Sequence, residues 1–124
     1  MAILDTNVVI EILRGNPKLT KFIDELQQHD QFAVTTITQY ELLKHLDAER
    51  RKDAREFISN VDVYSFDTEG AEAASSTYLK LKASGKLVNE NDILIAGIAK
   101  AKDELLVTTD RDFEKIEGLK LVVI

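Results

Sequence analysis

The sequence predicts a three-layer α/β/α domain with a central parallel sheet flanked by helices, and two observations support this prediction. Five short apolar runs alternate with longer segments whose apolar residues recur at helical spacing, an order typical of parallel α/β proteins. The runs are rich in Val, Ile and Leu and show little alternation, as expected for strands that helices cover on both faces.

The elements follow one another in a regular order. The expected strands cover residues 2–4, 32–34, 61–66, 105–107 and 119–124. The first expected helix begins at Thr6. Four further helices are expected over about residues 18–28, 38–59, 68–83 and 91–102, and a short turn over 111–115. Phe22, Ile23 and Leu26 give the second helix one apolar face. The helix after the second strand is expected to be capped by Thr36 or Thr38.

Composition limits the function classes. The chain of 124 residues is expected to form one domain, 1–124. It has no cysteine, which excludes disulfides, thiolate zinc clusters and thiol catalysis. No apolar stretch approaches the roughly 20 residues of a membrane helix, and an acid follows the first four residues, so we expect a cytoplasmic protein that does not insert into a membrane. The net charge of −6 argues against a surface that attracts nucleic acid everywhere.

Acidic residues follow several of the predicted strands at the point where each strand ends. Asp5 comes directly after the first strand, and Asp110 and Asp112 follow the fourth. Glu41 lies about one turn into the helix after the second strand, and Asp92 lies near the start of the last long helix. Because ligands bind beyond the carboxyl ends of parallel strands, we expect these carboxylates to meet at one edge of the sheet.

Each acid also has an ordinary structural interpretation. Asp5 and Asp110 could cap the helical segments that follow them, and Glu41 and Asp92 could be favourable charges near helix N-termini. These roles do not explain why four acids converge on one end of one sheet. Close carboxylates repel one another and raise one another's pKa unless a cation or a shared proton compensates them. A metal site is the simpler interpretation.

The type of donor selects the metal. An all-oxygen site without His or Cys suits hard divalent ions such as Mg²⁺ or Mn²⁺ and disfavours zinc. Hard ions that are held by a few carboxylates, with water as their remaining ligands, commonly catalyse phosphodiester hydrolysis and phosphoryl transfer. The spacing leaves open whether the site holds one ion or two.

Four motifs in this order resemble the PIN-domain ribonucleases, and within them the VapC-type toxins of prokaryotic toxin–antitoxin pairs. The motifs are Asp5-Thr6-Asn7, Thr38-Gln39-Tyr40-Glu41-Leu42, Asn91-Asp92-Ile93-Leu94-Ile95-Ala96 and Thr108-Thr109-Asp110-Arg111-Asp112-Phe113. The resemblance covers essentially the whole chain. It implies a parallel sheet flanked by helices, Mg²⁺ or Mn²⁺ in the site, and endonucleolytic hydrolysis of RNA by metal-activated water that leaves a 5′-phosphate.

The resemblance also implies roles for individual residues. The catalytic carboxylates, which also serve as metal ligands, are Asp5, Glu41, Asp92 and Asp110. Asp112 is expected to be a lesser metal ligand. Thr6 and Asn7 are expected to orient Asp5, and Thr108 to hydrogen-bond a carboxylate or a bound water. No core acid is missing, so the motifs give no sign of a catalytically inactive copy.

The distribution of basic residues suggests the substrate contacts, and the resemblance implies the partners. The residues expected to contact RNA are Arg14, Lys44 and His45. Other lysines form scattered patches that could touch phosphates or lie on solvated helix faces, namely Lys80, Lys82, Lys86, Lys100 and Lys102. A VapB-like antitoxin is expected, with its tail in the acidic groove, and the toxin is expected to form a homodimer. We expect the antitoxin groove where residues 18–26 meet residues 38–59.

Other function classes stay open at this point. The main alternative is a catalytically idle PIN-like module that binds RNA or metal. A receiver-like signalling module would need an acidic pair after the first strand, and Asp67 is its only candidate phospho-acceptor. Histidine-based ribonuclease chemistry would require His29 and His45 to meet across the scissile bond. Cleavage by the wild type but not by an Asp5→Asn variant would separate the enzyme from the idle module.

Overall fold

The computed structural model describes residues 1–45 and 47–124, and its centre is a parallel five-stranded sheet. The strands are β1 (Ala2–Leu4), β2 (Phe32–Thr35), β3 (Asp62–Tyr64), β4 (Leu105–Thr108) and β5 (Leu121–Val123). Their order in the sheet is β3-β2-β1-β4-β5, and every neighbouring pair is parallel. Each of the five predicted strands is present, with small differences at its ends.

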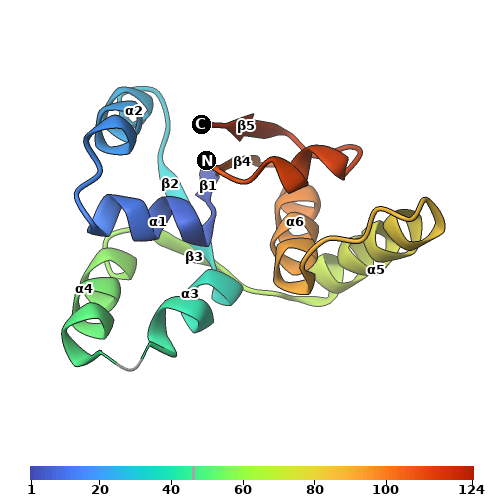
Figure 1. The fold of residues 1–124 in the computed structure, drawn as a ribbon, viewed down its shortest axis with the longest axis horizontal. Helices are drawn as coiled ribbons and strands as arrows, with labels where there is room; N and C mark the ends of the chain where they lie inside the picture. The colour runs from blue at the N-terminus through green and yellow to red at the C-terminus, as the bar shows by residue number, and fades with distance from the viewer. Residues whose placement is uncertain (46) are drawn as a thin grey trace.

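Helices cover both faces of this sheet, which confirms the predicted three-layer α/β/α architecture (Figure 1). They are α1 (Thr6–Leu13), α2 (Pro17–Gln27), α3 (Thr36–Leu43), α4 (Ala48–Ile58), α5 (Thr68–Ala83), α6 (Glu90–Lys102) and the short 3₁₀ helix η1 (Arg111–Lys115). In the view of Figure 1, α1, α2 and α4 lie on one side of the sheet and α5 and α6 on the other. Within the described part of the chain, none of these helices has both the length and the apolar character needed to cross a membrane.

The strands are apolar throughout because each face of the sheet has its own core. Neighbouring residues of a strand point to opposite faces. Ile3 therefore packs with residues of α5 and α6. Ala2 and Leu4 pack with residues of α1, α2 and α4. All three strand residues are fully buried, so no polar alternation marks the strand in the sequence.

The segment expected as one helix over residues 38–59 is instead two helices, α3 and α4. The chain leaves the first helix at Lys44. Asp47 then caps the second, because its side chain accepts a hydrogen bond from the Glu49 N–H at 2.9 Å. The cap of α3 is also one residue earlier than expected: the Thr35 hydroxyl accepts from the Thr38 N–H at 3.2 Å. Strand β2 runs on to Thr35, so its last residue becomes the helix cap.

Helices α5 and α6 pack closely against each other. Gly97 in the middle of α6 lies against Gly70 and Ala74 of α5. A Cβ atom built on Gly97 would lie 2.7 Å from the Ala74 Cβ and 2.8 Å from the Gly70 carbonyl oxygen. No real Cβ atom tolerates such contacts, so the absence of a side chain at Gly97 sets the distance between the two helices.

A Gly97→Ala substitution is expected to destabilise the protein by about 1–3 kcal/mol, because the added methyl group overpacks this contact. In an uncrowded helix interior the same change would stabilise by about 0.5–1 kcal/mol, so the sign of the effect is diagnostic. Urea unfolding measures it. Gly70→Ala is the matched control, since its Cβ would have only an ordinary 3.4 Å contact with Ile98. A stabilising Gly97→Ala would contradict the packing described.

Candidate functional site

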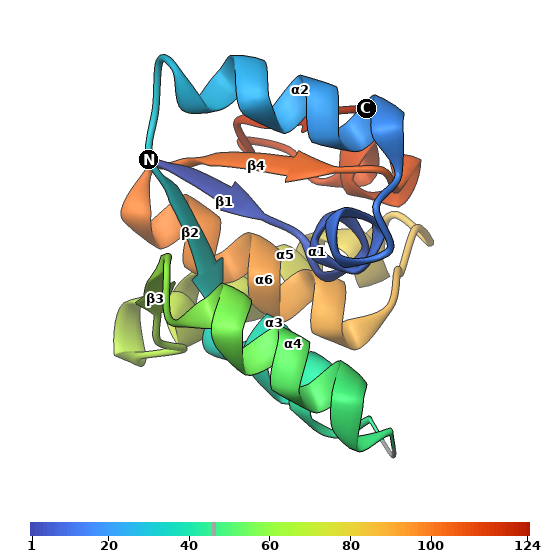
Figure 2. The same cartoon turned by 90° about the vertical axis from the view of Figure 1, so that its left-hand side faces the viewer.

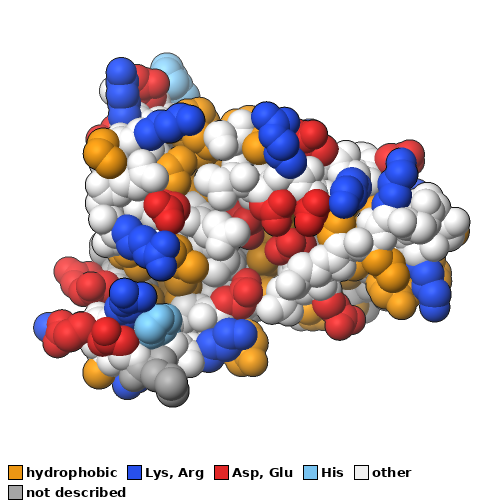
Figure 3. Space-filling model, viewed as in Figure 1, with side chains coloured by type: hydrophobic (Ala, Val, Ile, Leu, Met, Phe, Trp, Pro, Cys, Tyr) orange, Lys and Arg blue, Asp and Glu red, His pale blue; other side chains and the backbone are white. Residues whose placement is uncertain are grey.

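Five acidic side chains line one cleft at the carboxyl edge of the sheet. β1 lies between β2 and β4, so the residues that follow these strands are neighbours in space. The cleft has a volume of about 370 Å³, and its lining residues are Asp5, Thr6, Asn7, Glu41, Asn89, Asp92, Asp110 and Asp112. Figure 3 shows acidic side chains gathered near the middle of this face of the molecule. The four predicted core acids thus lie together, although they are separated by up to 105 residues in the sequence (110 − 5).

Asp5 is the most deeply placed of these acids, with 3% of its surface exposed. Its Oδ2 accepts a hydrogen bond from the Thr108 hydroxyl at 2.8 Å. Its Oδ1 accepts from the Thr6 N–H at 2.8 Å, which makes Asp5 the N-cap of α1 as well. Burial raises the pKa of Asp5 even though both hydrogen bonds favour the ionised form. Capping and a place in the cleft are therefore not alternatives for this residue.

Glu41 is held by hydroxyl groups. Its Oε1 accepts from the Thr6 hydroxyl at 2.7 Å, and the hydroxyls of Thr6 and Thr38 are 2.9 Å apart. A hydroxyl has one hydrogen, so when Thr6 donates to Glu41 it is Thr38 that donates to Thr6. The Thr6 side chain therefore holds Glu41, and only its backbone N–H contacts Asp5. Thr38 was not among the predicted site residues; the signal for it is a hydroxyl on the same helix face, three residues before Glu41.

Asp110 and Asp112 enter the cleft from the start of η1. The Asp110 side chain accepts from the Asp112 N–H at 2.9 Å and so caps this short helix. The Asp110 N–H in turn donates to the Thr108 hydroxyl oxygen at 3.0 Å. Thr108 thus connects Asp110 to Asp5, since the same hydroxyl donates to Asp5. The Asp112 side chain is half-exposed, and it forms an ion pair with Lys115 at 3.1 Å.

Asp92 shows how strongly the acids interact. It is half-buried near the start of α6, and its pKa is raised from 3.8 to about 7. Loss of hydration on burial is the largest cause, followed by repulsion from the other acids of the cleft, Asp5, Asp110, Glu41 and Asp112. Among the described residues, no Lys or Arg lies within ion-pair distance of the four core acids. The cleft therefore lacks an internal counter-charge.

This donor set fits a hard divalent cation, because it consists of carboxylate oxygens without a nearby His or Cys. The acids line the cleft without already converging on one point: in residues 1–45 and 47–124, no three Asp, Glu or His side chains form a ready-made metal-binding group. Burial and, after it, repulsion from the other acids raise the pKa of Asp92, and a bound cation would relieve the repulsion.

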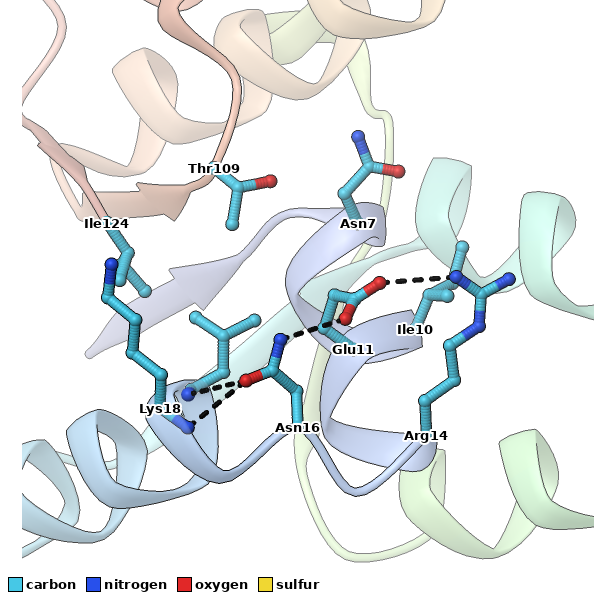
Figure 4. Close-up of a pocket in the computed structure, with 9 residues that line it drawn as sticks. Asn7, Ile10, Glu11, Arg14, Asn16, Lys18, Thr109 and Ile124 are labelled. Carbon is cyan, nitrogen blue, oxygen red and sulfur yellow. Dashed lines mark hydrogen bonds and ion pairs between the residues drawn. The ribbon is translucent and has the colours of Figure 1, made fainter.

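Asn7 lies between the cleft and a larger neighbouring pocket. That pocket has a volume of about 550 Å³ and is lined mainly by α1 and the start of α2 (Figure 4). Its one acid, Glu11, is already engaged by Arg14 at 3.2 Å and by the Asn16 amide at 3.0 Å. The larger pocket therefore offers no free carboxylate, and the smaller acidic cleft is the better candidate for chemistry. Asn89 of the cleft was not predicted; it caps α6, accepting from the Asn91 N–H at 2.9 Å.

Lys44 and His45 lie at the far end of α3 and do not line the acidic cleft. The Lys44 ammonium is 5.1 Å from the centre of the Tyr40 ring. The His45 Nδ1 accepts from the Asp47 N–H at 3.1 Å. Two of the predicted RNA contacts line pockets that adjoin the cleft: Arg14 lines the larger pocket, which shares Asn7 with the cleft, and Arg14 and His45 both line a further pocket that shares Glu41 with it.

The groove expected between residues 18–26 and 38–59 is built differently. α1 lies between α2 and the pair α3 and α4 (Figure 2). Phe22 and Leu26 of α2 pack against the core of the sheet. The pocket of about 430 Å³ in this region is formed by α1, α3 and α4, with Leu13, Leu42 and His45 among its lining residues. The apolar face of α2 therefore packs into the core, and the helix that lies beside α3 and α4 is α1, not α2.

An Asp92→Asn substitution is expected to stabilise the metal-free protein above pH 7. The pKa of Asp92 is higher in the folded than in the unfolded chain, so wild-type stability falls as the pH rises from about 3.8 to about 7. The expected gain is about 1–2 kcal/mol, because solvent screens this half-exposed carboxyl. Thermal unfolding in EDTA at pH 4 and pH 8 measures it. The exposed Asp103→Asn is the control; equal effects at both pH values would contradict the prediction.

The sequence and the fold match known proteins. The family model of the PIN domain matches residues 2–119. The "tRNA(fMet)-specific endonuclease VapC" of Shigella flexneri is 29% identical over 123 residues, which cover 94% of this chain and 92% of the relative. "Ribonuclease VapC3" of Methanocaldococcus jannaschii is 32% identical over 99 residues, 78% of this chain and 96% of the relative.

A solved structure agrees with these relatives. The crystal structure of DNA-bound VapBC from Salmonella typhimurium contains a chain that superposes with a TM-score of 0.85 at 30% identity, covering 98% of this chain and 96% of that one. The residues matched by the family model include β1 to β4 and every acid of the cleft. The chain belongs to the PIN domain family.

Proposed function

We propose that this protein is a metal-dependent endoribonuclease and the toxin of a VapBC-type toxin–antitoxin pair. The observation that carries the proposal is the cleft in which four carboxylates from four separate segments meet without a basic partner. Phosphodiester hydrolysis by metal ions needs such a site, an all-oxygen cleft open to solvent. The names of the two relatives, an endonuclease and a ribonuclease, support the same reaction.

The metal would be Mg²⁺ or Mn²⁺. The residues that would hold it are Asp5, Asp92 and Asp110, with Glu41 and Asp112 at the sides of the cleft. When bound, such an ion supplies an activated water and neutralises negative charge that develops on the phosphate. The same charge would remove the repulsion among the acids, so metal binding and full ionisation of Asp92 would favour each other.

The protein's own part is to hold the carboxylates in place. The Thr108 hydroxyl donates to the Asp5 carboxylate and accepts from the Asp110 backbone N–H, so it positions both acids. Thr6 fixes Glu41. Asn7 stands exposed at the mouth of the cleft, where its amide could contact the substrate, and Arg14 beyond it could contact an RNA phosphate. Lys44 and His45 would have to meet a more distant part of the RNA, because they lie outside the cleft.

We also propose a VapB-like antitoxin as partner, with its tail in the acidic cleft. The crystallised relative from Salmonella typhimurium is a VapBC complex, which supports this partner. The pocket between α1, α3 and α4 opens beside the cleft, since Glu41 lines both, and it combines apolar residues with Arg14 and Arg50. A peptide with apolar side chains for that pocket and a basic side chain for the acids would complement both.

A homodimer is part of the proposal. Large apolar side chains are exposed on α3, on α5 and just before α5, namely Tyr40, Phe66, Tyr78 and Leu79. A contact face between two copies would bury side chains of this kind. Light scattering decides the point, because a mass equal to one chain would contradict the dimer.

Asp5→Asn and Asp92→Asn are each expected to reduce RNA cleavage at least about 100-fold, because each removes a carboxylate that would hold the metal ion. The assay uses purified protein, a pool of cellular RNA, Mg²⁺ or Mn²⁺, and mapping of the product ends. Asp103→Asn, an exposed acid outside the cleft, is the control and should keep full activity.

EDTA should abolish cleavage by the wild type, and the products should carry 5′-phosphates. Cleavage that persists in EDTA would mean that the acids are assigned the wrong role. A folded, metal-loaded protein that cuts no RNA would favour the idle RNA- or metal-binding module.

Thr108→Val is expected to reduce cleavage about 10- to 100-fold, because Asp5 loses the hydroxyl that orients it. Thr108→Ser keeps the hydroxyl and should restore most of the activity. The pH dependence of RNA cleavage by both variants tests this role further. The pKa of Asp5 should rise in the Val variant only. Equal losses in the two variants would indicate that packing, and not the hydrogen bond, matters at this position.

A further inference from the structure

A second pocket, outside the acidic cleft, is surrounded by lysines. Its volume is about 510 Å³, and it lies between the C-terminal half of α5, α6 and the end of η1. Four lysines from separate parts of the chain line it, namely Lys80, Lys86, Lys100 and Lys115. Glu117 is the one acid among the lining residues. Lysines that are scattered in the sequence therefore form one cluster in space.

Most of this positive charge is not compensated. In the described part of the chain, neither Lys80, Lys86 nor Lys100 has a carboxylate within ion-pair distance. Lys100 is half-buried, and its ammonium donates to the Thr77 hydroxyl at 2.9 Å. Burial and the charge of Lys80 lower the pKa of Lys100, whereas Glu117 acts in the opposite direction. Such a cluster is unfavourable by itself and becomes favourable when an anion binds.

The lysine pocket lies close to the acidic cleft. η1 connects them: Asp110 and Asp112 at its start line the cleft, and Lys115 and Ile116 at its end line the lysine pocket. A five-residue 3₁₀ helix is about 10 Å long at roughly 2 Å per residue. In Figure 3, basic side chains border the acidic group on the side of α5. A single polymer strand lying in the cleft can therefore reach the pocket.

We propose that the lysine pocket binds the phosphate backbone of the RNA substrate, a few nucleotides away from the bond that lies in the acidic cleft. This inference rests on the proposed ribonuclease function. A cleft lined by five acids repels a polyanion, and the whole chain has a net charge of −6. Affinity for RNA must then come from positive sites beside the cleft. Lysine ammonium groups bind phosphates as point charges, without a demand for base sequence.

The test compares two double variants of equal charge. Lys80→Gln/Lys86→Gln removes two exposed lysines of the pocket, and Lys21→Gln/Lys52→Gln removes two exposed lysines of α2 and α4. The probe is a fluorescein-labelled single-stranded RNA, and fluorescence anisotropy in EDTA measures its Kd at several KCl concentrations. EDTA prevents cleavage during the measurement.

The pocket variant should bind several-fold more weakly at low salt. The slope of log Kd against log[KCl] should become shallower by about 0.7 for each RNA phosphate that the variant no longer binds. The control variant should keep the wild-type slope. Lys100→Met should repeat the weaker binding, with circular dichroism to establish that it is folded. In cleavage assays the pocket variant should raise KM and leave kcat unchanged, because these lysines do not touch the reacting phosphate.

Three outcomes would overturn the proposal, and they are distinguishable. If the wild type binds and cuts RNA but the pocket variant keeps its slope, the lysine pocket is not an RNA site and the proposed function stands. If the wild type neither binds nor cuts RNA, the proposed function and this inference both fail. If the pocket variant loses only the binding of inorganic phosphate, measured by ³¹P NMR, the pocket takes a small anion and not RNA.

Discussion

The parallel pairing of β1 with both β2 and β4 is the constraint on which the rest of the structure depends. Because these three strands run in one direction, their carboxyl ends meet at one edge, and the residues that follow them come together whatever their separation in the chain. Asp5, Thr6 and Asp110 are placed by this pairing alone. The helices then cover the two apolar faces, and α6 brings Asp92 to the same edge.

Hydroxyl groups make this concentration of acids possible. Thr6, Thr38 and Thr108 are all buried, and their hydroxyls form the contacts of Asp5 and Glu41. Hydrogen bonds to the ionised form partly compensate for lost hydration, so the carboxylates keep fixed positions while they repel one another. Among the described residues, no buried side-chain polar atom lacks a partner. Asp92 accepts no side-chain hydrogen bond among the described residues, so neither its lost hydration nor the repulsion from the other acids is compensated, and its pKa is raised to about 7.

Local patterns predicted the strands, the layers and the acids at the strand ends, because parallel strands between helices are apolar without interruption. They did not predict what depends on contacts distant in sequence. Thr38 looks like an ordinary helix residue until Thr6 is placed beside it, and the lysines around Lys100 look scattered until α5 and α6 pack together. The break between α3 and α4 was also missed. Its signal, the cap at Asp47, is short and lies in a strongly charged segment.

The central position of β1 also has a consequence for protein synthesis. The ribosome makes β1 long before β4, yet β4 must pair directly with β1 before the sheet can close. Asp5, at one end of the chain, and Asp110, near the other, belong to the same cleft. A nascent chain that ends before Asp112 lacks at least one acid of the site. A growing chain therefore carries no assembled cleft until β4 and η1 have left the ribosome.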